Sequence, residues 1–207
     1  MYFELVQKNM DLFSADFEII RDDSCVGTMH LQGSLGQKEA TWTGSFGEDK
    51  VQLSPGMVSP KLNAGNPFRP YTIALNGTEK GGICQADVKA GLFSTIDYHH
   101  MEFDGVEYKM YPIGFGQEGG KNPIYCNDEQ IALIETDCVI VDGLHVYKIF
   151  CVDGKASVIA LLFAMYMYSM AGYKAGEKVI KSVEKIVSIT TSKHLKAKYD
   201  PSFKERV

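Results

Sequence analysis

The densest group of potential metal ligands in this chain of 207 residues is the run His99-His100-Met101-Glu102. Alternate residues of a β-strand share a face, so His100 is expected beside Glu102 and His99 beside Asp97. Two ligands on one face can begin a zinc site, but the remaining ligands must come from elsewhere in the chain. We keep His100 and Glu102 as candidate ligands and expect the run to lie on the solvent face of a strand. We expect neither a metal nor a cofactor.

Motifs for nucleophilic, metal-dependent or phosphate-transfer catalysis do not occur in the sequence. It contains no GxSxG, no HExxH and no GxxxxGK[ST]. The pairs Gly81-Gly82 and Gly119-Gly120 stand between predicted strands, where they favour turns or bulges. No catalytic residue can be assigned, and we predict that the protein is not an enzyme.

The positive charge of the chain is concentrated at its end. Nine basic and four acidic side chains give residues 174–207 a net charge of +5, whereas 12 basic and 22 acidic side chains give residues 1–173 a net charge of −10. The total of −5 argues against nucleic acid as the main partner, because phosphate binding needs a basic surface. An anionic membrane surface or a protein is the partner we expect.

A lysine stripe is the one feature of the sequence with a testable binding role. A second helix is predicted from about Gly176 to Ser192, because Val179, Val183 and Ile186 recur at helical spacing. On another face we expect four lysines that would meet anionic lipid headgroups, namely Lys174, Lys178, Lys181 and Lys185. The alternative is a surface helix that packs its apolar stripe on the protein and leaves the lysines in water.

Cysteine usage and the N-terminus predict a cytoplasmic location, with membrane contact of a peripheral kind only. The five cysteines are odd in number, form no CxxC pair and lie in apolar, strand-like runs, so we expect buried, reduced thiols. The N-terminal residues show no basic-then-apolar signal pattern.

Most of residues 1–152 is typical of short β-strands joined by turns. The residues are rich in β-branched and aromatic types, and dipeptides such as Asn76-Gly77 and Asp104-Gly105 suit two-residue hairpin loops. Residues 124–152 follow a meander whose last strand places Tyr147, Ile149 and Cys151 on one apolar face. We count eleven to thirteen strands, which is typical of an antiparallel sandwich or barrel within a single domain.

Residues 155–172 predict a helix that is apolar on every side, capped by Asp153 at its start. Three environments compete for it: a membrane, the face of a sheet and the inside of a barrel. Its length barely reaches that of a membrane span, and it has no polar face to turn outward. About 18 residues at about 1.5 Å each match the height of a barrel, and about twelve strands enclose too wide a space to fill without a plug. We therefore predict a barrel around this helix, with six residues as its main core contacts: Ile159, Leu162, Phe163, Tyr166, Met167 and Met170.

This order of elements resembles the tubby C-terminal-like fold, which LURP-one-related proteins and phospholipid scramblases share. The resemblance is carried by the meander IYCNDEQIALIETDCVIVDGLHVYKIF and by SVIALLFAMYMYSMAGY directly after it. FEIIRDDSCVGTMHL is also similar, and KHLKAKYDPSFKERV resembles the ending of bacterial members. It covers about residues 15–173 and implies one mainly β domain over residues 1–207: a closed barrel of about twelve antiparallel strands (1–152), the buried helix (155–172), and an outer amphipathic helix and tail (174–207).

The resemblance implies lipid-related functions. Tubby-like domains bind phosphoinositide headgroups and attach reversibly to membranes, and scramblases are linked to lipid movement and calcium. This sequence lacks the basic phosphoinositide-binding strands of the former and the acidic calcium-binding segment and cysteine cluster of the latter. We predict a non-enzymatic binding or scaffold module of tubby-like type that engages anionic lipid headgroups or a protein partner. The alternative is an enzyme or small-ligand carrier with its site at the mouth of the barrel.

Overall fold

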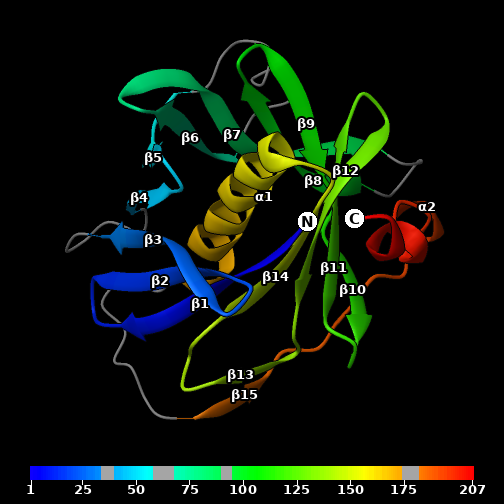
Figure 1. The fold of residues 1–207 in the computed structure, drawn as a ribbon. Coiled ribbons are helices and arrows are strands. Elements are labelled where there is room, and N and C mark those ends of the chain that lie inside the picture. Colours follow the sequence, from blue (N-terminus) through cyan, green and yellow to red (C-terminus); the bar gives the residue numbers. More distant parts are fainter. Residues whose placement is uncertain (34–39, 58–67, 90–94, 174–181) are drawn as a thin grey trace.

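The computed structural model describes residues 1–33, 40–57, 68–89, 95–173 and 182–207. Twelve antiparallel strands close into a barrel around one helix (Figure 1), as the sequence predicts. In spatial order they are β12 (Glu129–Thr136), β14 (Val146–Cys151), β1 (Tyr2–Met10), β2 (Ser14–Arg21), β3 (Ser24–Gln32), β4 (Thr41–Phe46), β5 (Asp49–Pro55), β6 (Phe68–Leu75), β7 (Thr78–Lys89), β8 (Thr95–Phe103), β9 (Val106–Met110) and β11 (Gly120–Cys126). The pairing of β11 with β12 completes the ring.

Alternation along the strands decides which side chains fill the barrel. Phe3 and Leu5 of β1 are fully buried, as are Ile134 of β12 and Ile149 of β14, and all four belong to one continuous core. The intervening residues face outward, which is the period-two pattern of a sheet with one buried face. The barrel therefore has a single apolar interior rather than two separate cores.

One end of the barrel carries five two-residue turns, and we call it the turn end. These turns are Asp22-Asp23, Gly47-Glu48, Asn76-Gly77, Asp104-Gly105 and Asn127-Asp128. Asn76, Gly77, Asp104 and Gly105 all have φ between 50° and 77°, the left-handed region that asparagine, aspartate and glycine tolerate best. The two turns predicted from these dipeptides are confirmed. The opposite end, where the remaining connections lie, is the loop end.

The central helix enters at the turn end. Helix α1 (Gly154–Met167) begins where Asp153 accepts a hydrogen bond from the Ala156 amide at 2.7 Å, and it continues as one π-helical segment, η2 (Tyr168–Gly172). The predicted core residues Ile159, Leu162, Phe163 and Tyr166 are fully buried, whereas Met167 and Met170 are partly buried against the same core. Gly154–Gly172 is long and apolar enough to cross a membrane, and the barrel encloses it instead.

The predicted helix over 176–192 is wrong for the part that the structure describes. Residues 174–181 lie outside the described residues, and the chain beyond them forms β15 (Val183–Lys185) and β16 (Ser188–Ile189). The β-branched residues that suggested an apolar helical stripe also favour extended structure, and pairing with other strands selects it. β15 pairs with β13 (Val139–Val141), and β16 pairs with β10 (Ile113–Gly116).

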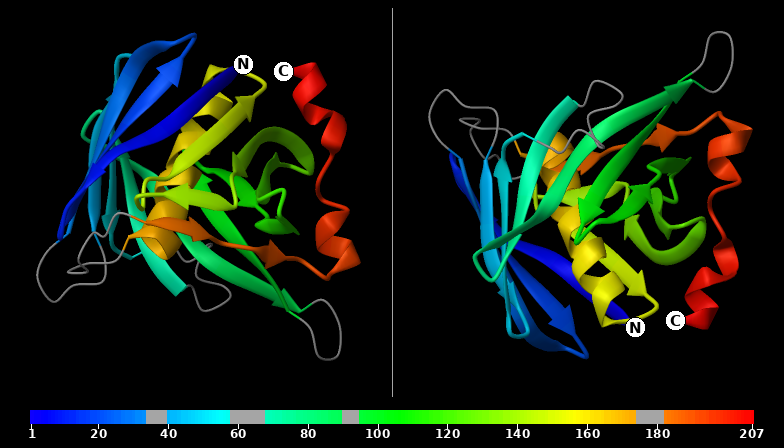
Figure 2. Two further views of the ribbon diagram at one scale, coloured as in Figure 1. Left: turned by 90° about the horizontal axis from the view of Figure 1, so that it is seen from below. Right: turned by 90° about the horizontal axis from the view of Figure 1, so that it is seen from above.

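Residues 182–190, which we call the crossing segment, run across the loop end below the end of the central helix (Figure 2). Gly114 lets this segment approach closely, because a Cβ atom at that position would lie 2.3 Å from the Ser188 carbonyl oxygen. The Gly114 amide and carbonyl bind the Thr190 hydroxyl and amide, each at 2.9 Å. The crossing segment is thus fixed by backbone pairing on both of its sides.

An outer C-terminal helical segment is present, as predicted, but it begins later in the chain. It consists of α2 (Lys193–Lys196) and the 3₁₀ helix η3 (Pro201–Arg206), which pack on the outside of the barrel. Glu135 of β12 anchors it, with the ammonium groups of Lys204 and Lys121 at 2.9 and 3.0 Å from one carboxylate oxygen. Burial opposes ionisation of Glu135, but the two lysines outweigh it and lower the pKa of the carboxyl.

The described structure contains five free thiols, but the predicted burial of all five is wrong for three of them. Cys84 and Cys151 are buried, and burial raises the pKa of the two thiols to about 11 and about 12 respectively. Cys126 and Cys138 are half-buried, and Cys25 is exposed near the turn end.

Candidate functional site: the loop end of the barrel

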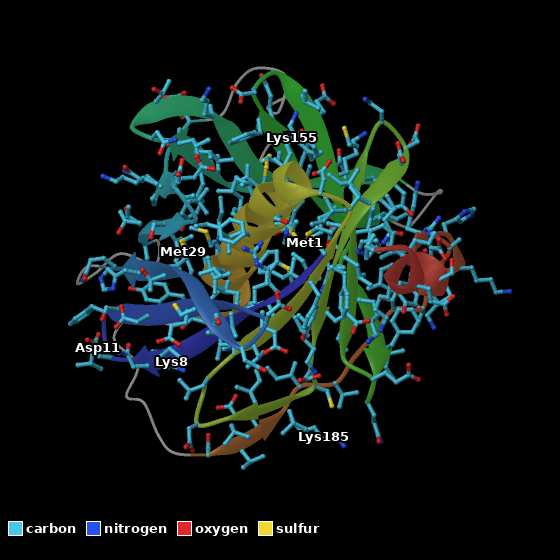
Figure 3. All side chains as sticks on the ribbon, viewed as in Figure 1. Met1, Lys8, Asp11, Met29, Lys155 and Lys185 are labelled. Atoms are coloured by element: carbon cyan, nitrogen blue, oxygen red, sulfur yellow. The ribbon has the colours of Figure 1, made fainter. Side chains whose placement is uncertain are left out.

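The structure describes one of the four predicted lipid-binding lysines. Lys174, Lys178 and Lys181 lie outside the described residues. Lys185 lies on β15, directly opposite Val139 of β13, and is exposed at the loop end. In Figure 3 it lies at the end of the molecule opposite Lys155, which begins the central helix. Lys185 therefore belongs to a β-ribbon and not to a helix.

Two basic side chains of the tail, Lys198 and Lys204, are held by the barrel. The Lys198 ammonium lies 5.2 and 5.5 Å from the ring centres of Tyr111 and Tyr125, and the Tyr125 hydroxyl donates to the Lys198 carbonyl oxygen at 2.6 Å. Lys204 binds Glu135 and lies over the Phe150 ring. These cation–π and ion-pair contacts attach the tail to the acidic body. These two basic side chains therefore serve the fold, whereas Lys185 and Lys193 are exposed.

The candidate metal ligands His100 and Glu102 do not gather further ligands among the described residues. His100 Nε2 lies 3.4 Å from a Glu107 carboxylate oxygen, a contact that lacks hydrogen-bond geometry. Burial of His100 lowers its pKa, which favours the neutral ring. Within the part of the chain that the structure describes, no three His, Cys, Asp or Glu side chains are placed to hold a metal ion.

His99 corrects the expectation that this run faces solvent. It points into the barrel, where its ring meets the Tyr166 ring edge-on at 5.1 Å. Burial lowers the pKa of His99 to about 4, so the ring is neutral near pH 7. Its Nδ1 atom is buried and has no hydrogen-bond partner among the residues that the structure describes. Sequence alternation placed His99 and His100 on opposite faces, but it did not show that both faces would be covered.

Toward the loop end the barrel interior becomes polar. Three strands carry an apolar inward-facing residue near the turn end and a polar one at the next inward position toward the loop end. These pairs are Leu5 and Gln7 on β1, Ile124 and Asn122 on β11, and Ile134 and Thr136 on β12. His145 and Tyr147 precede the inward Ile149. Gln7 and Asn122 are both buried. Buried polar groups require hydrogen-bond partners, so this change in the lining indicates a specific arrangement.

Gln7 links the central helix to the barrel wall. Its side-chain amide donates to the Tyr168 hydroxyl at 3.0 Å, and its side-chain oxygen accepts from the His145 amide at 3.0 Å. The backbone amide of Gln7 donates to the His145 carbonyl oxygen at 2.9 Å. One residue thus holds η2, β1 and the start of β14 together.

A second polar contact fixes the same end of the helix. The indole of Trp42 donates to the Ser169 hydroxyl at 2.7 Å, and that hydroxyl donates to the Met165 carbonyl oxygen at 3.1 Å. π-helical segments are rare and occur mostly at functional sites. Here the segment η2 is held from two sides of the barrel and borders an unfilled space.

That space is a cavity of about 230 Å³ between the end of the central helix, the polar ends of β11, β12 and β14, and the crossing segment. Its walls are mostly apolar, with Ile113, Ile140 and Met167 among them, and Ile186 comes from the crossing segment. The polar side chains on it are Asn122, Thr136, Asp137, His145, Tyr147 and Ser188. Asp137 is neutralised by Lys148, whose ammonium lies 3.1 Å from its carboxylate.

Two of these polar side chains retain unused hydrogen-bonding capacity. The Asn122 amide nitrogen donates to the Ile134 carbonyl oxygen at 2.9 Å, and among the described residues nothing donates to the Asn122 side-chain oxygen. The Tyr147 hydroxyl makes no hydrogen bond with any residue that the structure describes, although Tyr147 is only 4% exposed. Burial raises the pKa of Tyr147, which keeps the phenol neutral.

The outer surface of the loop end exposes several aliphatic side chains. On the two-stranded ribbon of β13 and β15, Val139, Val141 and Val183 share the solvent-facing side with Lys185. Ile186, Val187 and Ile189 follow along the same chain and are 48–67% exposed. We call these six aliphatic residues the aliphatic patch. Contiguous exposed apolar surface marks interaction sites, whereas single exposed residues do not.

Most exposed large hydrophobic side chains lie at the loop end rather than at the turn end. The described residues include eleven exposed large hydrophobic side chains, and eight of them lie at the loop end. Besides the aliphatic patch these are Leu12, in the connection between β1 and β2, and Met57, just after β5. Only Met1, Tyr2 and Val152 lie at the turn end.

Comparisons found no matching protein-family model, no similar curated protein and no similar solved structure. The tubby-like resemblance therefore stays a prediction, and the loop end is the main source of evidence about function.

Reasoning from sequence missed most of this site. It named Tyr147 only as part of an apolar strand face, and it did not single out Gln7 or Asn122. A signal was present, because polar residues at inward positions of otherwise apolar strands break the alternation. Reading that signal requires knowing which end of each strand meets the others, and the closed ring of pairings supplies this information.

Proposed function

We propose that this protein is a non-enzymatic binding module of tubby-like type that attaches to an anionic membrane surface through its loop end. The observation that carries the proposal is the aliphatic patch, where three valines share one face of the β13–β15 ribbon with Lys185. Aliphatic side chains enter the apolar boundary of a bilayer, and adjacent lysines meet its headgroups.

The arrangement of charge favours a membrane over a merely apolar partner. Lys185 lies on the exposed face, whereas Glu184 pairs with Ile140 and so lies on the other side of the ribbon. A lysine near an anionic surface contributes about 1 kcal/mol. Lys193 and Lys196, just beyond the crossing segment, are also exposed. The acidic body opposes approach, but salt screens charges beyond about 8–10 Å.

The position of the patch also suits a planar surface. It lies at the end of the barrel, together with Leu12 and Met57, so a flat bilayer can contact several segments at once. The central helix does not need to leave the barrel for this attachment. Binding of this kind is reversible, because each aliphatic residue contributes only a small apolar area.

Vesicle flotation tests the proposal. The full chain is mixed with vesicles of phosphatidylcholine alone, or of phosphatidylcholine with a minor fraction of phosphatidylserine, at low and high salt. We expect flotation with the anionic vesicles that weakens at high salt. The double variant Val141→Ser/Val183→Ser should abolish flotation, and Lys185→Glu should reduce it. All three substitutions are at exposed positions, so folding should be unaffected.

Matched control variants come from the turn end. Val152 is 48% exposed and Lys155 is exposed there, so Val152→Ser and Lys155→Glu repeat the same chemical changes away from the patch. Both should float like the unaltered protein. The proposal fails if the unaltered protein does not float with anionic vesicles. It also fails if the control variants lose as much flotation as the patch variants. Self-association that Val183→Ser removes, without vesicle binding, would instead identify the patch as a contact between two copies.

A further inference from the structure

We infer that the cavity under the crossing segment binds a small neutral molecule that is mainly apolar and carries one hydroxyl group, such as a simple phenol. This inference goes beyond membrane attachment and does not depend on it. It rests on the size of the cavity, the lack of charge on its walls and the two polar side chains with unused hydrogen-bonding capacity.

The size of the cavity suits a single-ring molecule. Its volume is about 230 Å³, and a protein cavity of about 150 Å³ lined by apolar side chains already holds benzene. Most drug-sized ligands need about 300 Å³ or more. The occupant is therefore larger than a water molecule and smaller than a nucleotide or a lipid.

The charges around the cavity exclude ions. Among the described residues its lining contains no lysine or arginine, so these residues offer an anion no counter-charge. Asp137, the lining residue with a negative charge, is already paired with Lys148 at 3.1 Å. An unpaired ion in such a place costs far more than a neutral polar group. The remaining class of occupant is neutral.

The hydrogen-bonding groups indicate a hydroxyl. The Tyr147 phenol can donate, the Asn122 side-chain oxygen can accept, and neither capacity is used by the residues described. Tyr147 lines the cavity, and its hydroxyl is not among the fully buried polar atoms, so a molecule in the cavity can reach it. A hydroxyl group suits either side chain, because it can accept from the Tyr147 phenol or donate to the Asn122 oxygen.

The structure also shows why the cavity persists. The Ile186 amide donates to the Cys138 carbonyl oxygen at 2.7 Å, and Gly114 binds Thr190 on the other side. The crossing segment is thereby held across the loop end and cannot simply collapse into the space below. The helix end is held by Gln7 and Trp42 at the same time.

The test uses p-cresol, toluene and 4-methylbenzoate as probes, with binding to the full chain measured by calorimetric titration and by saturation-transfer NMR. p-Cresol should bind saturably at one site. Toluene, which has the same shape without the hydroxyl, should bind between about threefold and tenfold more weakly, as one neutral hydrogen bond predicts. 4-Methylbenzoate, an anion near neutral pH, should not bind.

Two kinds of variant separate the contributions. Tyr147→Phe removes one of the two hydrogen-bonding groups, so it should weaken p-cresol binding toward the level of toluene and leave toluene binding unchanged. Tyr108→Phe is the matched control, because Tyr108 is equally buried but does not line the cavity. Ala171→Trp fills the cavity from an exposed position of η2 and should abolish binding of both probes. Ile186→Trp does the same from the crossing segment if the first variant does not fold.

The inference is overturned if no probe binds saturably, which would mean that the cavity holds only water. It is equally overturned if p-cresol binds no better than toluene, or if both cavity-filling variants bind p-cresol normally. The outcome is independent of the vesicle test, because Val141→Ser/Val183→Ser alters the outer face of the ribbon and should leave p-cresol binding intact.

Discussion

The two ends of this barrel are built from the same strands by different means. The turn end has five two-residue turns, an apolar interior and a helix N-terminus satisfied by Asp153. The loop end has longer connections, an interior lined by Gln7, Asn122 and Tyr147, a cavity and most of the exposed aliphatic residues. Two-residue turns have few positions at which the sequence can change, whereas longer connections can carry binding groups on a rigid scaffold. The difference indicates that one end secures the fold and the other end carries the function.

The largest effect should come from placing a charge between the two ends. Ala160→Asp puts a carboxylate at a fully buried position in the middle of α1, which costs several kcal/mol or more and should prevent soluble expression. Lys155→Asp places the same side chain at an exposed position near the start of the helix and should express normally. Normal folding of Ala160→Asp would show that the barrel does not enclose the helix.

A smaller loss of stability is expected when the polar interior of the loop end is altered. Gln7→Ala leaves the His145 amide and the Tyr168 hydroxyl without their present partner, which should lower the free energy of unfolding by about 1–3 kcal/mol. Urea unfolding can be followed through Trp42, the single tryptophan, which is fully buried. Gln52→Ala, at an exposed position, is the control and should change stability little. Equal effects of the two substitutions would show that Gln7 does not connect helix and wall.

His99 predicts a pH dependence of stability. Its pKa is about 4 in the folded protein and about 6.5 when exposed on unfolding. As pH falls from about 6.5 toward 4, the unfolded chain gains a proton that the folded protein does not accept, so the free energy of unfolding decreases. Between pH 6.5 and about 5 the loss should be roughly 1–2 kcal/mol.

The variant His99→Leu should flatten this part of the pH profile, which urea unfolding at several pH values would measure. His194→Leu, at an exposed position of α2, should retain the slope. His100, whose pKa burial also lowers, accounts for part of any slope that remains. An unchanged slope in His99→Leu would contradict the burial of His99.

The smallest of these effects should occur at the turn end. Asp153→Ala removes the side-chain oxygen that accepts from the Ala156 amide, at an expected cost of about 1 kcal/mol. Asp153→Asn keeps an acceptor at the same position and should be nearly neutral. If Asp153→Ala destabilises more than Gln7→Ala in urea, the turn end contributes more to stability than the interior network of the loop end.

Much of the barrel was predictable because its signals are local. Alternation predicted the inward face of β14, and the dipeptides Asn76-Gly77 and Asp104-Gly105 predicted two turns. The uniformly apolar segment predicted the buried helix. These features depend on neighbours in the chain, so their physical causes are visible in the sequence. The strands β1 and β5 were not singled out, although their side chains also alternate between buried and exposed positions.

The failures share a cause as well. Val183, Ile186 and Val187 fit a helical stripe and an extended strand equally well, and the partner strand β13 decided between them. The run His99-His100 is polar on both faces of its strand, so alternation could not identify which side is inside. In each case the information lies in which strands pair, and not in the segment itself.

The sequence by itself determined the kind of molecule: many antiparallel strands, one helix too apolar to meet water, and a basic end. Only the tertiary structure decided that polar positions far apart in the chain, Gln7, Asn122 and Tyr147, meet at one end of the barrel. It also decided that the crossing segment borders a half-open cavity there and turns its valines outward. Strand-forming and helix-forming tendencies are properties of neighbouring residues, whereas a site depends on the register of a closed ring that only the whole chain completes.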